Sequence, residues 1–399
     1  MLRVVWPSGE VLATVADLEE LSVRALKRQL RKLRRRLVPS KEFLLHGSRI
    51  LQDDDELDSP MDVTLVLRSF MEASRDQMER MQAAVERGQS LEVDQILRQL
   101  PDYDFGFSPL WTAAQENRTE IVRLLLEADA APDRTRTRTG YGATALCAAA
   151  QYGHVTVARL LLDADAQVEP AMEGEPSPFF LACAGGHVDV ARLLLDAGAD
   201  KNRAISHSYT PLSVASKGGH AAIVSLLLQA AVNPHQANDR GEIALHIACR
   251  GGHTDVAHLL LRTGAGKDRP DQSGCTPLYI AAYFGHNDIA SCLLEADAYV
   301  DPAFHTSGDT PLCATCQNGH VRILALLLDA GACLEHTNSA GDVPLCMAAR
   351  SGNLSVVRSL LAAMADSDRP NASGETPLAL AAEGGHAEIA RLLLMVGAN

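Results

Sequence analysis

The sequence predicts a mainly α-helical solenoid of about nine repeats, preceded by a small α+β domain. A phrase recurs through residues 104–399: a small polar residue, Pro-Leu, Gly-His, and a Leu-rich run that ends in Gly-Ala. Its copies begin 33 residues apart, except for intervals of 36 and 34. Their first residues are Ser108, Thr144, Ser177, Thr210, Ile243, Thr276, Thr310, Val343 and Thr376. A fixed period of this length indicates units that bury their apolar faces only against neighbouring units.

The first 70 residues lack this phrase and have the pattern of a small sheet with one helix. Pro7-Ser8-Gly9 separates two apolar runs, which predicts a β-hairpin. From Val23 to Leu37, apolar residues advance by three and four, as they do on one face of a helix. The segments that predict strands are 1–5, 11–15, 43–45 and 63–67.

Residues 44–68 carry a likeness to a known family. They contain His46-Gly47-Ser48-Arg49-Ile50-Leu51-Gln52-Asp53-Asp54 and Val63-Thr64-Leu65-Val66-Leu67-Arg68, which resemble the corresponding part of ubiquitin. The order of hairpin, helix, strand and late strand over residues 1–70 is similar to that of a ubiquitin-like β-grasp domain. The resemblance implies a recognition face near Leu45, Thr64, Val66 and Arg68. Strand alternation agrees, because Thr64, Val66 and Arg68 alternate with apolar residues that should face the core.

The predicted last strand continues as Arg68-Ser69-Phe70-Met71, without the Gly-Gly pair that conjugation requires. We therefore expect a permanently fused docking module for ubiquitin receptors or proteasomal subunits. The hairpin tip carries Pro7-Ser8 where ubiquitin has a large apolar residue, which implies an altered recognition face. A second interpretation stays open, in which the domain only caps the solenoid.

The two ends of the repeat region are expected to differ. Residues 71–103 predict a linker followed by degenerate capping helices over 81–87 and 91–100, around Gly88, since end repeats are usually atypical. The other end, 392–399, keeps the full consensus without a polar capping repeat. Either the natural chain stops there, or a partner or a second copy of the chain covers the last apolar face.

Each part of the repeated phrase has a mechanical role. A Thr at the helix start can accept a hydrogen bond from a free backbone N–H, and Pro suits the first helical position. A Gly such as Gly285 can end this helix at positive φ. The histidines after the repeat glycines should open the second helix and bond to neighbouring backbone, rather than bind a metal. These units resemble ankyrin repeats, and the resemblance covers 104–399.

The resemblance implies binding of proteins through projecting loops and a groove lined by the first helices. Positions just after the Leu of the phrase, and the two before the Gly, should face this groove. They are held by Trp111, Gln115, Glu116, Tyr152, Phe180, Lys217, Arg250, Tyr279, Tyr283, Phe284, Gln317, Arg350 and Glu383. Aromatic and Arg anchors dominate interface energetics, so the leading candidates are Arg250, Tyr279, Tyr283 and Phe284. An alternative for Trp111 and Phe180 is packing between repeats.

Charge and composition favour a protein partner. The net charge is −14, and it is uneven: residues 1–70 carry 12 Lys and Arg against 11 Asp and Glu, so the rest carries 24 against 39. An acidic solenoid is a poor ligand for nucleic-acid phosphates. We find no secretory signal and no apolar run of membrane-spanning length. The odd count of nine cysteines favours a reducing compartment, the cytoplasm. The basic run 24–36 leaves nuclear entry open, although a solvated helix face is the simpler interpretation.

No motif for catalysis, a cofactor or a metal is recognisable. The Cys313/Cys316 pair lies inside a repeat phrase, where buried small thiols are expected, and one such pair is weak evidence for a metal. The sequence therefore predicts a non-catalytic adaptor that binds a client protein and docks to the ubiquitin system. The alternative is a passive signalling or cytoskeletal scaffold.

Overall fold

The computed structural model describes most of the repeat region and parts of the N-terminal segment. Described are residues 75–99, 109–128, 130–135, 143–169, 175–304 and 307–398, and the strand backbones 2–5, 11–15, 41–46, 49–50, 62–68, 71–72 and 103–104. The chain divides into two compact units. Unit 1 comprises Met1–Pro109 with Glu127–Asp129, and unit 2 comprises Leu110–Leu126 with Ala130–Asn399.

Unit 1 contains a five-stranded sheet of order β2-β1-β5-β3-β4. The strands are β1 (Leu2–Val5), β2 (Val11–Val15), β3 (Lys41–His46), β4 (Arg49–Ile50) and β5 (Asp62–Arg68). β1 pairs antiparallel with β2 and parallel with β5, and β3 pairs antiparallel with β5 and β4. Four of these strands overlap the segments in which the sequence predicts strands. The helix predicted over 23–37 lies outside the described residues.

The rest of unit 1 is a helix pair beside a short two-stranded ladder. β6 (Met71–Glu72) pairs parallel with β7 (Tyr103–Asp104). Between them lie α2 (Arg75–Arg87) and α3 (Ser90–Gln99), whose apolar faces meet through Met81, Val85 and Val93, all fully buried. The helix pair around Gly88 is as predicted, but α2 begins at Arg75, inside the stretch expected to be a linker.

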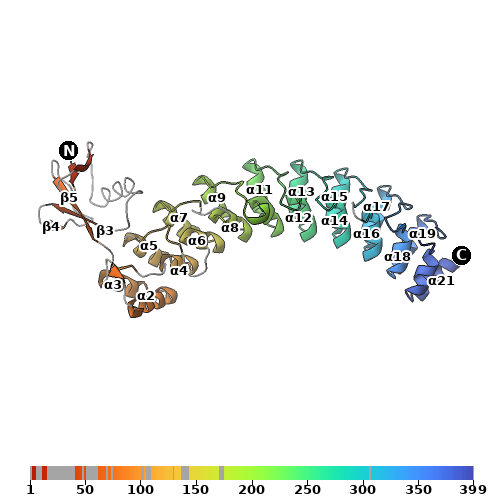
Figure 1. Cartoon of the computed structure of the whole chain (residues 1–399), viewed down its shortest axis with the longest axis horizontal. Coiled ribbons are helices and arrows are strands. Elements are labelled where there is room, and N and C mark those ends of the chain that lie inside the picture. The colour runs from red at the N-terminus through yellow and green to blue at the C-terminus, as the bar shows by residue number, and fades with distance from the viewer. Residues whose placement is uncertain are drawn as a thin grey trace. The chain divides into compact units, whose positions relative to one another are not determined.

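Unit 2 is a row of helix pairs. The first helices are α4 (Pro109–Gln115), α6 (Ala145–Tyr152), α8 (Pro178–Gly185), α10 (Pro211–Lys217), α12 (Ala244–Gly251), α14 (Pro277–Phe284), α16 (Pro311–Asn318), α18 (Pro344–Arg350) and α20 (Pro377–Glu383). The second helices are α5 (Thr119–Glu127), α7 (Val155–Asp163), α9 (Val188–Asp196), α11 (Ala221–Gln229), α13 (Thr254–Arg262), α15 (Asn287–Glu295), α17 (Val321–Asp329), α19 (Leu354–Ala362) and α21 (Ala387–Met395). From α6 onward the first helices form one row on the concave side, and the second helices form the other (Figure 1). A short 3-10 turn, η2 (Ser206–Ser208), lies in one connecting loop.

The predicted caps define the ends of the first helices. Thr276 Oγ1 accepts a hydrogen bond from the backbone N–H of Tyr279, with Pro277 at the first helical position. At the other end, Gly285 adopts φ 80° and its N–H bonds to the carbonyl of Ala281. The N-caps predicted at Thr144, Ser177, Thr210, Thr310 and Thr376 also accept such bonds. The expected roles of Thr, Pro and Gly are therefore confirmed.

The repeat histidines join each unit to the one before it. His253 Nε2 donates a hydrogen bond to the backbone carbonyl of Lys217, at 3.0 Å. The same bond joins His154 to Gln115, His187 to Gln151, His220 to Ala184, His286 to Arg250, His320 to Tyr283 and His386 to Arg350. Each of these histidines also opens a second helix, so their predicted structural role is confirmed. Asn353 replaces His in one repeat and donates to the carbonyl of Gln317 at 3.1 Å.

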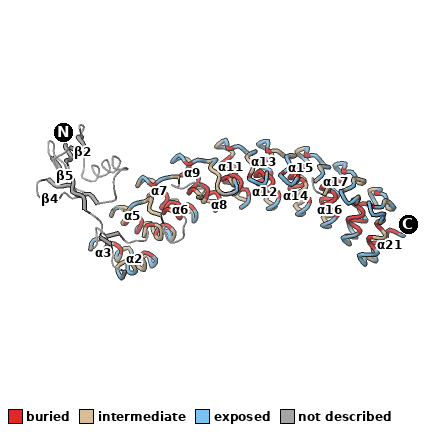
Figure 2. The backbone as a smooth tube through the Cα atoms, in the orientation of Figure 1, coloured by how far each residue is buried: buried red, intermediate tan, exposed pale blue. Residues whose placement is uncertain are grey.

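The core of unit 2 lies between the two rows of helices, and the connecting loops are exposed (Figure 2). Phe179, Leu146 and Leu194 are among its largest fully buried side chains. In the last repeat, Leu394, Met395 and Val396 are exposed. Within the described part of the chain, no helix combines the length and apolarity needed to cross a membrane.

Several residues after the second helices have a left-handed backbone although they carry a side chain. At this position Gly198, Gly264 and Gly331 have positive φ, and Met364 has φ 68° with 86% of its surface exposed. We predict that Met364→Gly raises the free energy of unfolding by about 1 kcal/mol, because left-handed backbone strains residues with a Cβ. Urea denaturation measures this gain. Met364→Ala keeps the Cβ and should show none, so an equal gain in both variants would contradict backbone strain as the cause.

Candidate protein-binding face

The histidine bonds define a set of equivalent positions on the first helices, which we call the inner row. Its members supply the carbonyls that accept these bonds: Gln115, Gln151, Ala184, Lys217, Arg250, Tyr283, Gln317 and Arg350. Glu383 holds the corresponding position in α20. All are exposed except Ala184 and Gln115, which are half-buried. The side chains of the inner row vary along the array: Lys217, Arg250 and Arg350 are basic, Tyr283 is aromatic and Glu383 is acidic.

The positions just after the Leu of the phrase are mostly buried, so the expectation that they face the groove is wrong as a rule. Phe180, His246 and Cys313 at these positions have 6% or less of their surface exposed. The reason is local: His246 in α12 and Cys346 in α18, each the third residue of its helix, lie beneath the next connecting loop. His246 shows this, since its Nε2 donates to the carbonyl of Cys275 in the next loop, at 3.2 Å. Trp111 and Tyr279 are the half-buried large exceptions.

His246 is a buried neutral imidazole. Its Nδ1 accepts the backbone N–H of Ile243 at 3.3 Å, while its Nε2 donates. Burial lowers its pKa below the ordinary value and outweighs the nearby carboxylate of Asp271. In a repeat that lacks an N-capping Thr, this histidine therefore accepts the N–H of the residue at the cap position, as Ser213 Oγ accepts the N–H of Thr210.

Four aromatic side chains meet at α14, and we call them the aromatic cluster: Tyr279, Tyr283, Phe284 and Phe304. Tyr279 and Tyr283 lie one turn apart with ring centroids 6.4 Å apart, and Phe304 stacks on Tyr279 at 5.4 Å. Phe284 meets Tyr283 edge-on at 5.1 Å. Tyr283 and Phe284 remain 43% and 47% exposed. Since Leu278, Ile280, Ala281 and Ala282 fill the buried side of the same helix, the cluster is its solvent-facing side.

The repeat pattern does not mark Phe304, which enters the cluster from a connecting loop. In four other loops, the residue whose N–H closes the turn is an Asn or Asp: Asn238, Asp271, Asn338 or Asn371. In this loop Phe304 takes that place, and its N–H bonds to the carbonyl of Asp309 at 2.8 Å. One extra residue separates Phe304 from Asp309, which explains the single 34-residue interval. The 34-residue interval was therefore the sequence signal that could have pointed to this loop.

Arg250 and Arg350 were predicted as groove anchors, but both are held by carboxylates of their own repeats. Arg250 pairs with Glu242, whose side chain is only 2% exposed. Arg350 makes two hydrogen bonds to Asp342, one at 3.0 Å, and lies 3.9 Å from Glu375. Both guanidinium groups therefore have a structural role, whatever they contact in a complex.

Lys217 and Tyr152, which were also predicted to face the groove, are both exposed. Lys217 is exposed and has no ion pair among the residues that the structure describes. Tyr152 is 48% exposed and stacks near His154, with centroids 6.1 Å apart. In the sheet of unit 1, backbone register pairs Leu45 with Thr64, and Val66 and Arg68 follow along β5. The side chains of these four lie outside the described residues.

The cysteines of the CxxC sequence are buried. Cys313 and Cys316 are fully enclosed, and burial raises the pKa of both thiols. Burial also raises the pKa of Cys346 to about 11. Within the described ranges, no three His, Cys, Asp or Glu side chains gather in a way that could hold a metal ion. These thiols fill space between helices and are poor nucleophiles.

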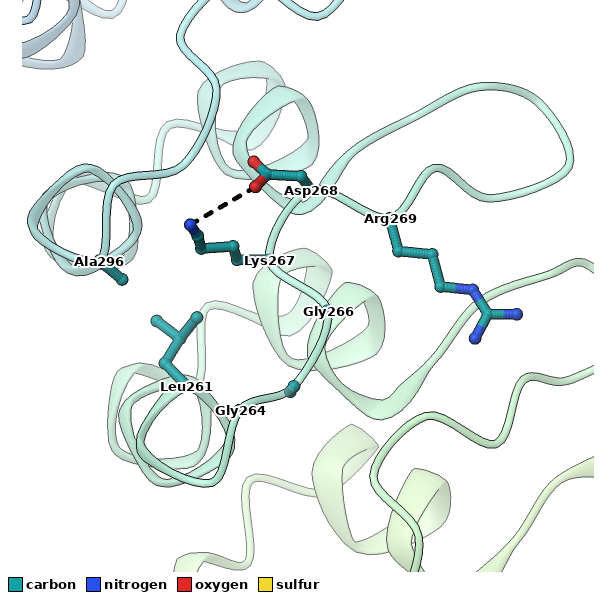
Figure 3. A pocket seen from close by; sticks show the side chains of 8 residues that line it. Leu261, Gly264, Gly266, Lys267, Asp268, Arg269 and Ala296 are labelled. Carbon is teal, nitrogen blue, oxygen red and sulfur yellow. Dashed lines mark ion pairs between the residues drawn. The ribbon is translucent and has the colours of Figure 1, made fainter.

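A pocket of about 460 Å³ lies between the loop after α13 and the end of α15 (Figure 3). It is lined by Leu261, Gly264, Lys267, Asp268, Arg269 and Ala296, among others. Its cations are engaged: Lys267 Nζ donates to the carbonyl of Asp297 at 2.8 Å, and Arg269 Nη1 donates to that of His235, also at 2.8 Å. The pocket is therefore a joint between repeats, and the aromatic cluster is the stronger candidate site.

A family model and a solved structure indicate the same architecture. A family model described as ankyrin repeats (3 copies) matches residues 81–172, 169–238, 212–303, 299–371 and 334–399. No curated protein matches the chain. The human ASB11 ankyrin repeat domain is similar at 27% identity and TM-score 0.51, over 56% of this chain and 99% of that one. The ankyrin repeat domain of Bcl-3, titled a unique member of the IkappaB protein family, matches at 26% identity and TM-score 0.49, over 55% and 100%.

Proposed function

This chain belongs to the ankyrin-repeat family, and we propose that it is a non-catalytic adaptor whose array binds a client protein. The single observation that carries this proposal is the aromatic cluster, which leaves large side chains exposed on the row of first helices. Exposed aromatic side chains that converge on one face are typical of interaction surfaces. The client would lie along the inner row, with Tyr279, Tyr283 and Phe284 as anchors.

The test is capture of partners by the immobilised full chain, compared between variants by quantitative mass spectrometry. We predict that Tyr283→Ala weakens binding of the captured client at least tenfold, because a central aromatic anchor is worth about 2 kcal/mol. Tyr299→Ala is the matched control: its side chain is 71% exposed and belongs to the loop after α15, outside the cluster. Equal affinity of both variants for the client would exclude this face.

Arg250 is a poor probe of this face. Replacing it would also leave the buried Glu242 without its cation, so lost capture could reflect a damaged repeat. Lys217→Ala is the cleaner basic variant, because its side chain is exposed and unpaired among the described residues. It reports how far the client extends toward α10.

For the N-terminal unit, we propose a ubiquitin-like domain over 1–70 that docks to ubiquitin receptors or proteasomal subunits. The strand order β2-β1-β5-β3-β4, with parallel β1 and β5 at its centre, supports this proposal. So does the register, which pairs Leu45 with Thr64 beside Val66 and Arg68. The full chain should retain receptor proteins that the Val66→Asp variant loses, while Thr14→Asp in β2 retains them. A wild-type chain that retains none of them would end this proposal.

The remaining assignments are proposals of the same kind. Residues 71–103 would connect and cap the array 104–399, and the exposed Leu394 and Met395 would meet a partner or a second copy. Cytoplasmic and nuclear residence both fit the composition. The alternative function is a passive scaffold, in which the N-terminal unit is only another protein contact.

A further inference from the structure

The aromatic cluster is not a requirement of the repeat. The position of Tyr279 is held by Ser213, His246, Cys313, Cys346 or Ala379 in neighbouring repeats, and that of Tyr283 by Lys217, Arg250, Gln317 or Arg350. Phe304 replaces the turn-forming Asn or Asp of four other loops. Three separate departures from the repeat thus bring aromatic rings to one place. Stacking of the helices alone would be satisfied without them.

A carboxylate accompanies the rings. Asp309 ends the loop that carries Phe304: its carbonyl accepts the N–H of Phe304 at 2.8 Å, and the Phe304 ring stacks on Tyr279 at 5.4 Å. Ser307 Oγ donates to Asp309 Oδ2 at 2.5 Å, and Asn338 Nδ2 donates to Oδ1 at 2.9 Å. These neutral donors fix the carboxylate in place. No cation pairs with it among the residues that the structure describes.

The charges on either side of the cluster are largely balanced within the protein. Toward the N-terminus, Arg250 is neutralised by Glu242. Toward the C-terminus, Arg350 faces two carboxylates, Asp342 and Glu375, which leaves that group negative. Among the described residues, the charge of Asp309 therefore has no counter-ion, and it lies beside the partly exposed aromatic cluster. Such a combination is complementary to a cation with an apolar stem, since ring faces and carboxylates both attract positive charge.

We propose that the aromatic cluster and Asp309 bind a cationic side chain, preferably arginine, from a basic segment of the client. This rests on the proposed function, because it names the chemistry of the client at that same face. The guanidinium lies against the exposed part of the Tyr283 ring, next to the Tyr279–Phe304 stack, and donates hydrogen bonds to Asp309. Arginine suits this arrangement better than lysine, because its planar group stacks on rings and makes two parallel bonds to a carboxylate.

The test starts from a library of random 12-residue peptides displayed on phage and selected on the immobilised full chain. Clones that bind the wild-type chain but not the Tyr279→Ala variant should share an arginine or lysine at one position. A synthetic peptide from this group should bind roughly tenfold more weakly when its arginine is replaced by citrulline, which keeps the shape and removes the charge. The citrulline comparison alters only the peptide, so it stays decisive even if a protein variant folds poorly.

Asp309→Asn, measured with the arginine and citrulline peptides, completes a double-mutant cycle. It should weaken the arginine peptide about tenfold and leave the citrulline peptide unchanged, while Tyr299→Ala, outside the cluster, should leave both unchanged. The inference is overturned if the cluster-dependent peptides share an apolar or acidic residue instead, or if they bind equally well with citrulline. Either outcome leaves the proposed client-binding face intact. If no selected peptide depends on Tyr279 or Tyr283, both the inference and that face are rejected.

Discussion

Replacing Gly219 with alanine should lower the free energy of unfolding by about 3 kcal/mol. Gly219 has φ 70°, a left-handed conformation that strains any residue with a Cβ. A Cβ here would also lie 2.5 Å from Nδ1 of His253 in the next repeat. To make room, the ring would have to move, which breaks its bond to the carbonyl of Lys217. Backbone strain and a lost joint between repeats therefore add together.

Gly385→Ala separates the two contributions. Gly385 has nearly the same backbone, φ 73°, but a Cβ there would meet nothing within 4 Å. We expect it to cost about 1 kcal/mol, the backbone strain alone. Urea unfolding followed by circular dichroism measures both variants against the wild-type chain. Equal losses would show that the histidine ring does not hold the repeat glycine in place.

Replacing Arg250 with methionine should destabilise the array by about 2 kcal/mol at pH 7 and by much less near pH 4. Burial alone would raise the pKa of Glu242, but the hydrogen bond from Asn238 and the charge of Arg250 outweigh it. The pKa of Glu242 therefore lies below its ordinary value of 4.5. Breaking a buried pair costs roughly 3–5 kcal/mol, and the cost here is smaller because Asn238 still donates to the carboxylate.

The sign of the pH dependence follows from that shift. A carboxyl whose pKa is lowered by folding stabilises the protein above its unfolded pKa, and this stabilisation is lost as pH falls through the folded value. Without Arg250 most of this stabilisation is absent. The free energies of unfolding of wild type and variant should therefore differ most above about pH 5 and converge below it. Lys217→Met, at the equivalent position in α10, is the control and should change little at any pH. A difference that does not depend on pH would show that Glu242 is not the group affected.

The array could be predicted because its period determines its packing. Thr276, Pro277 and Gly285 occupy the N-cap, the first helical position and the C-cap. Such capping residues are visible in a single sequence when they recur at 33-residue intervals. The histidine role was predictable for the same reason, since seven equivalent residues cannot all be catalytic. In the first 70 residues, the strands could be predicted because four short apolar runs are separated by a turn, a helical pattern and loops.

The binding face was harder, because it depends on contacts between a loop and a helix of different repeats. The sequence pattern did not show that residues after the phrase Leu lie under the next loop, as His246 does. It also could not show that Arg250 is tied to Glu242, eight residues earlier. Phe304 was missed because a single aromatic residue in a loop has no periodic counterpart. The interrupted spacing marked its loop, but only the stacking on Tyr279 identifies its part in the cluster.

Because the same imidazole bond joins each unit to the one before it, a whole unit could be removed without losing a joint. Excising residues 187–219 would join Gly186 to His220, and that ring would then reach the carbonyl of Gln151, which His187 uses in the intact chain. A shortened protein of this kind keeps every joint and should fold cooperatively. The unit around Phe304 is the exception, since its removal would spare the architecture but remove the proposed binding site.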